Sequence, residues 1–96
     1  VNNLEIWNQI PETIKNEIKF PLKNYENILN LAKNISTDLD LNQQEFLLDY
    51  TQRLWWQRTK NKKIAEILES IKNNINSNIQ PRISWEVGLL KVKLEG

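Results

Sequence analysis

Apolar residues recur at intervals of three and four along most of the chain, the spacing that places side chains on one face of an α-helix. The clearest helix is expected over residues 62–80, and others over about 21–35 and 43–59. The stripe at 62–80 consists of Ile64, Ile67, Leu68, Ile71, Ile75 and Ile79.

The first twenty residues have the same spacing, but Pro11 interrupts it. Because the residue before a proline avoids the α-helical region, we expect two short helices, over residues 3–9 and 11–19. Helix-capping residues gather before residue 43. Asn42 and Glu45 have the spacing of a capping box, and Asp40 is the competing cap.

The pattern changes after Pro81 from a period of 3.6 residues to a period of two. Apolar residues alternate with polar or small ones as far as Leu89, and the phase then slips beside Gly88, as at a bulge or a tight turn. We therefore predict a β-strand or hairpin over residues 81–96. A lone strand must pair with another segment, and the residues expected to take part are Ile83, Trp85, Val87 and Val92.

These patterns predict a mainly α fold, a small bundle of four to five helices over residues 1–80 followed by a C-terminal β-strand or hairpin. The length of 96 residues suits one small domain. The sequence begins at Val1, contains no methionine, and ends beside the predicted strand. We therefore expect a processed or excised module of a larger protein.

Composition narrows the chemistry that this domain can perform. The 13 basic and 12 acidic residues give a net charge of +1, so the whole domain has no strong attraction for nucleic acid or anionic membranes. Cysteine and histidine are absent, which excludes disulfides, Cys/His zinc sites, thiol nucleophiles and imidazole bases. The two glycines form no phosphate-binding loop. We predict no enzyme activity, no catalytic residues and no cofactor.

No apolar run approaches the ~20 residues of a membrane-spanning helix, and the N-terminus lacks the pattern of a signal peptide. The expected location is therefore the cytoplasm, with no membrane partner.

Carboxylates cluster around residues 38–49. Asp38, Asp40, Asn42 and Asp49 match four positions of an EF-hand calcium loop, but Gln43 stands where that loop needs glycine. We interpret the cluster as the N-terminal cap of a helix and predict no metal site. The least favoured hypothesis is an enzyme that uses the carboxylates of Asp38, Asp40, Glu45 and Asp49.

Five basic residues and no acid occupy residues 53–63, together with two tryptophans. At about 100° of rotation per residue, Trp56 falls opposite the apolar face of its helix, whereas Trp55 lies at the edge of that face. Trp56 is expected to be exposed unless it packs under the C-terminal strand. An exposed tryptophan among cations is typical of protein interfaces and of single-stranded nucleic-acid sites. The candidate binding residues are Arg53, Trp56, Arg58, Lys60, Lys62 and Lys63.

The leading hypothesis is a non-enzymatic protein–protein interaction or assembly module of a larger protein or complex. Its partner would be another protein or another part of the parent chain, and self-association through the C-terminal strand is one route. The alternative is a nucleic-acid-binding helical domain that uses the basic and tryptophan residues of 53–63.

Overall fold

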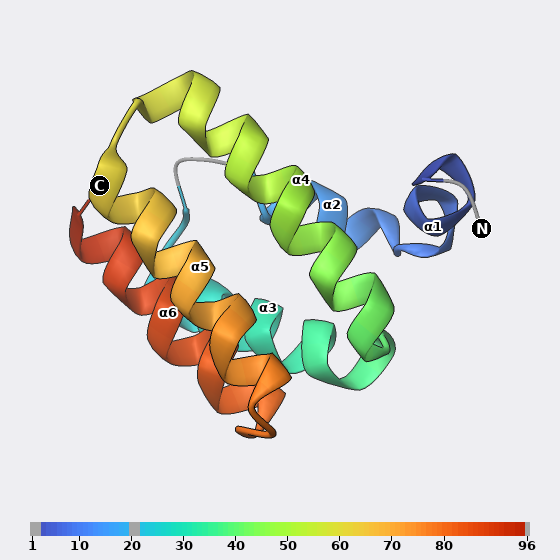
Figure 1. Cartoon of the computed structure of the whole chain (residues 1–96). Helices are drawn as coiled ribbons and strands as arrows, with labels where there is room; N and C mark the ends of the chain where they lie inside the picture. The colour runs from blue at the N-terminus through green and yellow to red at the C-terminus, as the bar shows by residue number, and fades with distance from the viewer. Residues whose placement is uncertain (1–2, 20–21, 96) are drawn as a thin grey trace.

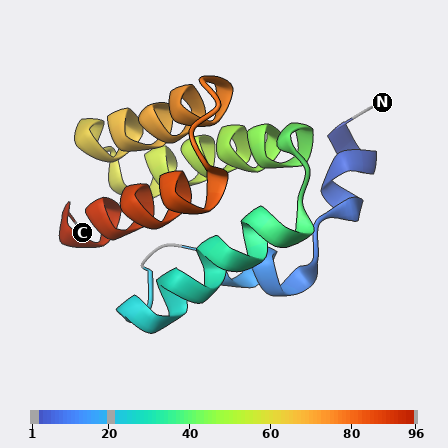
Figure 2. The ribbon, with the colours of Figure 1, turned by 90° about the horizontal axis from the view of Figure 1, so that it is seen from below.

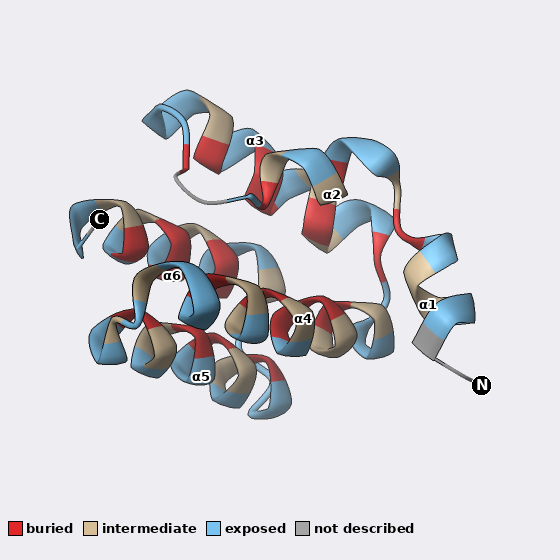
Figure 3. Cartoon of the chain, turned by 90° about the horizontal axis from the view of Figure 1, so that it is seen from above, coloured by how far each residue is buried: buried red, intermediate tan, exposed pale blue. Residues whose placement is uncertain are grey.

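The computed structural model describes residues 3–19 and 22–95, and helices account for nearly all of its regular structure (Figure 1). The helices are α1 (Asn3–Gln9), α2 (Glu12–Glu17), α3 (Tyr25–Asp38), α4 (Leu41–Thr59), α5 (Lys62–Asn76) and α6 (Pro81–Glu95). Helix α6 packs against both α3 and α5, and α5 also packs against α4. The short helices α1 and α2 pack against α4 and α3, respectively. The views from below and above show α6 between α3 and α5 (Figures 2 and 3).

The predicted C-terminal strand is wrong, because residues 81–95 form a helix and the described residues contain no strand. Pro81 is the first residue of α6, where its missing N–H leaves no hydrogen bond unmade. The Ser84 N–H donates to the Gln80 carbonyl at 3.1 Å and so closes the first turn of α6. Strand pairing through Ile83, Trp85, Val87 and Val92 is therefore ruled out in this fold, and Gly96 lies outside the described residues.

The apparent period of two arises because α6 is apolar on two opposite faces. Trp85, Leu89 and Val92 are buried in the core, whereas Ile83 and Val87 are exposed on the other side of the helix. Each face has helical spacing, but together the two faces make every second residue from 83 to 89 apolar. An isolated α6 sequence therefore resembles a half-buried strand.

A glycine allows α5 and α6 to approach closely. Gly88 is buried on α6, and a Cβ at this position would overlap the side chain of Ile71 on α5. The close approach brings the apolar stripe of α5 against α6, with Ile64, Leu68, Ile71 and Ile75 all buried. The glycine that suggested a bulge or a turn is therefore a point of contact between two helices.

The helices expected before residue 80 are present, with some ends displaced. Helix α3 begins at Tyr25 after the Asn24 cap, rather than at Pro21, which lies outside the described residues. Helix α4 begins at Leu41 because Asp40, not Asn42, is the cap. The Asp40 carboxylate accepts the Gln43 N–H at 2.8 Å, and the Gln43 side chain accepts the Asp40 N–H at 2.9 Å.

Two buried tryptophans tie the helices together through their indole N–H groups. Trp55 of α4 donates to the Ile18 carbonyl at 2.9 Å, which fixes the end of α2 against α4. Trp85 of α6 donates to the Gln44 side chain at 3.0 Å, and the Gln44 amide donates to the Leu39 carbonyl at 3.0 Å. These bonds satisfy buried polar groups that would otherwise destabilise the core. In the part of the chain that is described, no helix is long and apolar enough to cross a membrane.

Candidate functional site

The predicted basic and tryptophan residues lie where α4 ends and α5 begins. Helix α4 ends at Thr59, and its C-cap, Lys60, adopts the left-handed conformation with φ of 52° and donates its N–H to the Trp56 carbonyl. Asn61 then caps α5 by accepting the N–H groups of Lys63 and Ile64 at 2.9 and 3.3 Å. This tight turn brings the last residues of α4 beside the first residues of α5.

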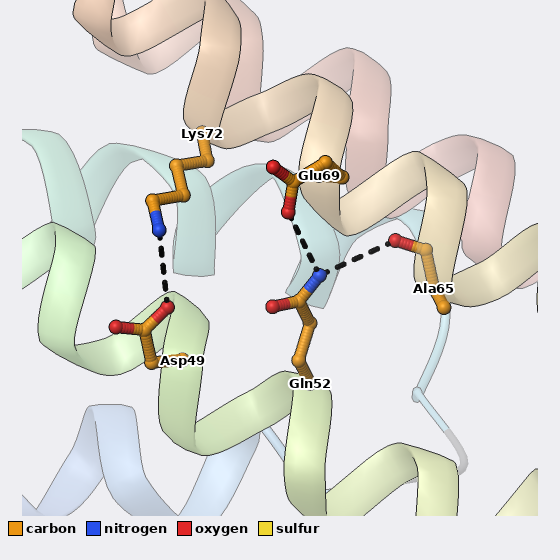
Figure 4. Close-up of polar contacts among 5 residues, drawn as sticks. All are labelled: Asp49, Gln52, Ala65, Glu69 and Lys72. Carbon is orange, nitrogen blue, oxygen red and sulfur yellow. Dashed lines mark hydrogen bonds and ion pairs between the residues drawn. The ribbon is translucent and has the colours of Figure 1, made fainter.

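Polar contacts hold α4 and α5 in an antiparallel arrangement (Figure 4). The Gln52 amide lies 3.4 Å from the Ala65 carbonyl and 3.3 Å from a Glu69 carboxylate oxygen. One turn earlier on α4, Asp49 forms an ion pair with Lys72 at 3.5 Å. The acid that precedes Arg53 by one turn is therefore already engaged by a cation on α5.

The two adjacent tryptophans have opposite environments, as their helical positions predict. Trp55 is fully buried, whereas 44% of the Trp56 surface is exposed. The Lys60 ammonium lies 5.7 Å from the centre of the Trp56 ring, within range of a cation–π contact. The predicted exposure of Trp56 is confirmed, and the alternative that it packs under a C-terminal strand is wrong.

The structure divides the six candidate residues among three surfaces. Arg58 points away from the others and lines a surface pocket with Lys19, while Lys63 lines the groove between α5 and α6 with Lys91. Arg53, Trp56 and Lys60 share one face of α4, and Lys62 is the first residue of α5, directly after the turn. We refer to Arg53, Trp56, Lys60 and Lys62 as the basic–Trp patch. Their binding role is still a prediction.

The exposed face of α6 forms a second surface, which sequence reasoning missed. Ile83, Val87 and Leu94 are 50%, 46% and 75% exposed, and Leu90 is partly buried. Their spacings of four, three and four residues place them in one row along the helix. We call these four residues the α6 stripe. The same spacing was present in the sequence, but it was obscured by the core residues on the opposite face.

Of the acidic residues interpreted as a helix cap, only Asp40 caps α4. The four residues are not arranged around a common centre. Asp38 is the last residue of α3, and the Asp40 carboxylate is used by the capping box. Glu45 lies along α4 beside Gln43 and Phe46, and the Asp49 carboxylate contacts Lys72. Among the described residues, no group of three or more carboxylate side chains is placed to hold a metal ion.

A small helical domain, with no strand among the described residues, is the class that this fold defines. The chain belongs to the family described as cyanobacterial DNA polymerase III delta prime, C-terminal domain, whose model matches residues 1–92. It is thus a module of a replication complex, which accords with the predicted assembly role. No curated protein and no solved structure matches the chain.

Proposed function

We propose that this domain is a non-enzymatic protein-interaction module that binds another subunit of DNA polymerase III through the α6 stripe. The single observation that carries the proposal is the apolar character of α6 on the side opposite its core face. A helix that is apolar on both sides is normally covered on both sides. The family supports a protein partner, because its members are domains of a polymerase subunit.

The α6 stripe has the dimensions and chemistry of a helix-binding surface. Its residues run from Ile83 to Leu94, so the row spans three helical turns, enough to pack against a partner helix. Burying the exposed parts of Ile83, Val87 and Leu94 would contribute about 1 kcal/mol for each side chain. Isolated apolar residues on a surface are ordinary, but a continuous row marks an interaction site.

Charged groups border the stripe and form the polar rim of the proposed interface. Glu86 lies on one side and is paired with Arg82 at 3.7 Å, while exposed Lys91 lies on the other. Interfaces commonly have such a rim around an apolar centre. These groups would orient a partner helix, while the apolar row would supply most of the binding energy.

The test is binding to the other DNA polymerase III subunits of the same genome, each purified and titrated against this domain. A variant with Ile83→Gln, Val87→Gln and Leu94→Gln replaces the three exposed residues of the stripe without changing the net charge and leaves the partly buried Leu90 in place. We expect the wild-type domain to bind at least one subunit and the triple variant to bind it at least tenfold more weakly. Calorimetric titration measures both affinities.

Leu4 and Leu41 provide a matched control, because both are exposed leucines on other helices. Leu4→Gln with Leu41→Gln should leave the affinity unchanged, and all variants should melt within a few degrees of the wild type, since surface substitutions change stability little. Equal binding by the triple variant and the wild type would refute the α6 stripe as the interface.

A further inference from the structure

The basic–Trp patch concentrates positive charge around an exposed aromatic ring. Arg53 and Lys60 share the outer face of α4 with Trp56, and Lys62 begins α5 directly after the turn. The patch thus contains three cations. Because the net charge of the whole chain is only +1, the residues outside the patch carry a net charge of −2. The field at this corner is therefore stronger than the overall charge suggests.

The described residues leave these cations without acidic partners. Ion pairs join Lys15 to Glu12, Lys72 to Asp49 and Arg82 to Glu86, and none of them includes a cation of the patch. The acid on the same face of α4 is Asp49, and its carboxylate contacts Lys72 of α5 at 3.5 Å. The charge of the patch is available for an external anion.

Two of the lysines stand at positions that are unfavourable for folding. Lys60 has a positive φ, which residues other than glycine rarely adopt. Lys62 is the first residue of α5, where the helix dipole repels a cation. The side chain of Asn61 already caps the first amides of α5, so the anion would be held by side chains and not by this helix end. Residue types that lower the stability of the fold at their own position are typical of functional surfaces.

We propose that the basic–Trp patch binds single-stranded DNA, with one base stacked on Trp56 and the neighbouring phosphates on Arg53, Lys60 and Lys62. Stacking requires an unpaired base, which favours a single strand over a duplex. DNA is the polymer that a DNA polymerase subunit encounters. The patch lies on α4 and the start of α5, apart from the α6 stripe, so a protein partner and DNA would use different surfaces.

The experiment titrates the whole domain into a fluorescently labelled oligo-dT of about 12 nucleotides, a length within the usual range of single-strand sites. Anisotropy gives the affinity between about 50 and 200 mM salt. Three phosphate contacts predict that log K falls with log salt with a slope of about −2. Trp56→Ala should weaken binding about tenfold, and Trp56→Phe should restore most of the affinity, because a phenyl ring still stacks.

Lys62→Gln separates binding from folding. Removing a cation from the start of α5 should raise the melting temperature by about 2 °C, because the repulsion by the helix dipole is lost. The same change should weaken DNA binding and reduce the salt slope by about 0.7. A variant that is more stable but binds less cannot owe its defect to misfolding.

Lys33→Gln is the matched charge control, because Lys33 is an exposed lysine on α3, outside the patch. It should leave the salt slope and the effect of Trp56→Ala unchanged. The α6 stripe variant should bind DNA normally, so the two interaction proposals can fail independently.

Four results would overturn the proposal. They are no binding at 50 mM salt, an affinity unaffected by Trp56→Ala, equal affinity for a duplex of the same phosphate number, and equal competition by an acidic peptide of matched charge. The last result would assign the patch to an acidic protein segment.

Discussion

Single residues in this domain have environments that depend on their neighbours as well as on their type. Trp55 and Trp56 are adjacent, yet one is fully buried and the other is a surface residue. Helical rotation predicted this difference from the sequence. It could not predict that the Trp55 indole donates to Ile18, which is 37 residues away, because that contact depends on how α2 packs.

The burial of Gln44 could not be predicted from the sequence. A glutamine on a helix normally faces water, but Gln44 is buried and both ends of its amide are hydrogen-bonded. The Leu39 carbonyl is a local partner, but the Trp85 indole is 41 residues away and reaches Gln44 only because α6 packs there. The buried face of α4 therefore includes the polar residues Gln44 and Thr51, whereas Phe46 and Tyr50 are only partly buried.

Thr51 is the residue at which a small change should stabilise the fold. Its side chain is fully buried, and its hydroxyl has no hydrogen-bond partner among the described residues. Thr51→Val keeps the shape and removes the unsatisfied group, so we expect the free energy of unfolding to rise by about 1 kcal/mol. Urea denaturation measures this change, with the slope m unchanged.

Thr59 supplies the control of opposite sign on the same helix. Its hydroxyl donates to the Trp55 carbonyl at 2.8 Å and accepts the Asn61 N–H at 3.2 Å. Thr59→Val should therefore lower the free energy of unfolding by about 1 kcal/mol. A loss of stability in Thr51→Val as well would mean that the Thr51 hydroxyl does make a bond, and the expectation would be wrong.

Among whole elements, α5 and α6 show why one helix was predictable and the other was not. The apolar residues of α5 lie mainly on one face, so their period appears directly in the sequence. Those of α6 lie on two faces, one in the core and one exposed, and the sum of two helical patterns imitates a strand. Pro81 was a usable signal, because proline favours the first position of a helix as well as the end of the preceding one.

The beginning of α4 gives a prediction about competing caps. Asp40 forms a reciprocal capping box with Gln43, whereas Asn42 is exposed within the first turn. Asp40→Ala should lower the free energy of unfolding by about 1 kcal/mol, and Asn42→Ala should change it little or raise it slightly, because alanine favours the helix interior. Thermal denaturation of the two variants tests this. The reverse order of stabilities would show that Asn42 is the cap in solution.

For the molecule as a whole, the candidate surfaces depend on helix pairing that no local pattern contains. The sequence predicted the basic and tryptophan residues of 53–63, but it could not show which of them remain together. Gln52 contacts Glu69 and Asp49 contacts Lys72 across the antiparallel pair of α4 and α5 (Figure 4). The turn that follows α4 places Lys62 at the start of α5, two residues after Lys60. The turn between the helices sends Lys63 toward α6 instead.

The position of α6 between α3 and α5 yields a prediction for the complete fold. A terminal strand added to a finished bundle would be dispensable, but α6 contributes Trp85, Leu89 and Val92 to the core and covers both neighbouring helices. Removal of residues 81–96 should therefore expose the apolar faces of α3 and α5. We expect residues 1–80 alone to lose most of their helical circular dichroism and to show no cooperative thermal transition.

Removal of residues 1–9 is the control, because α1 lies at one end of the molecule and packs mainly against α4 (Figure 1). Its contribution to the core is the half-buried Trp7, whose ring lies 4.3 Å from that of Tyr50. This shorter chain should still unfold in one cooperative transition at a lower temperature, since the packing of α3, α5 and α6 is retained. If residues 1–80 also unfolded cooperatively, α6 would be an accessory helix and the core would lie elsewhere.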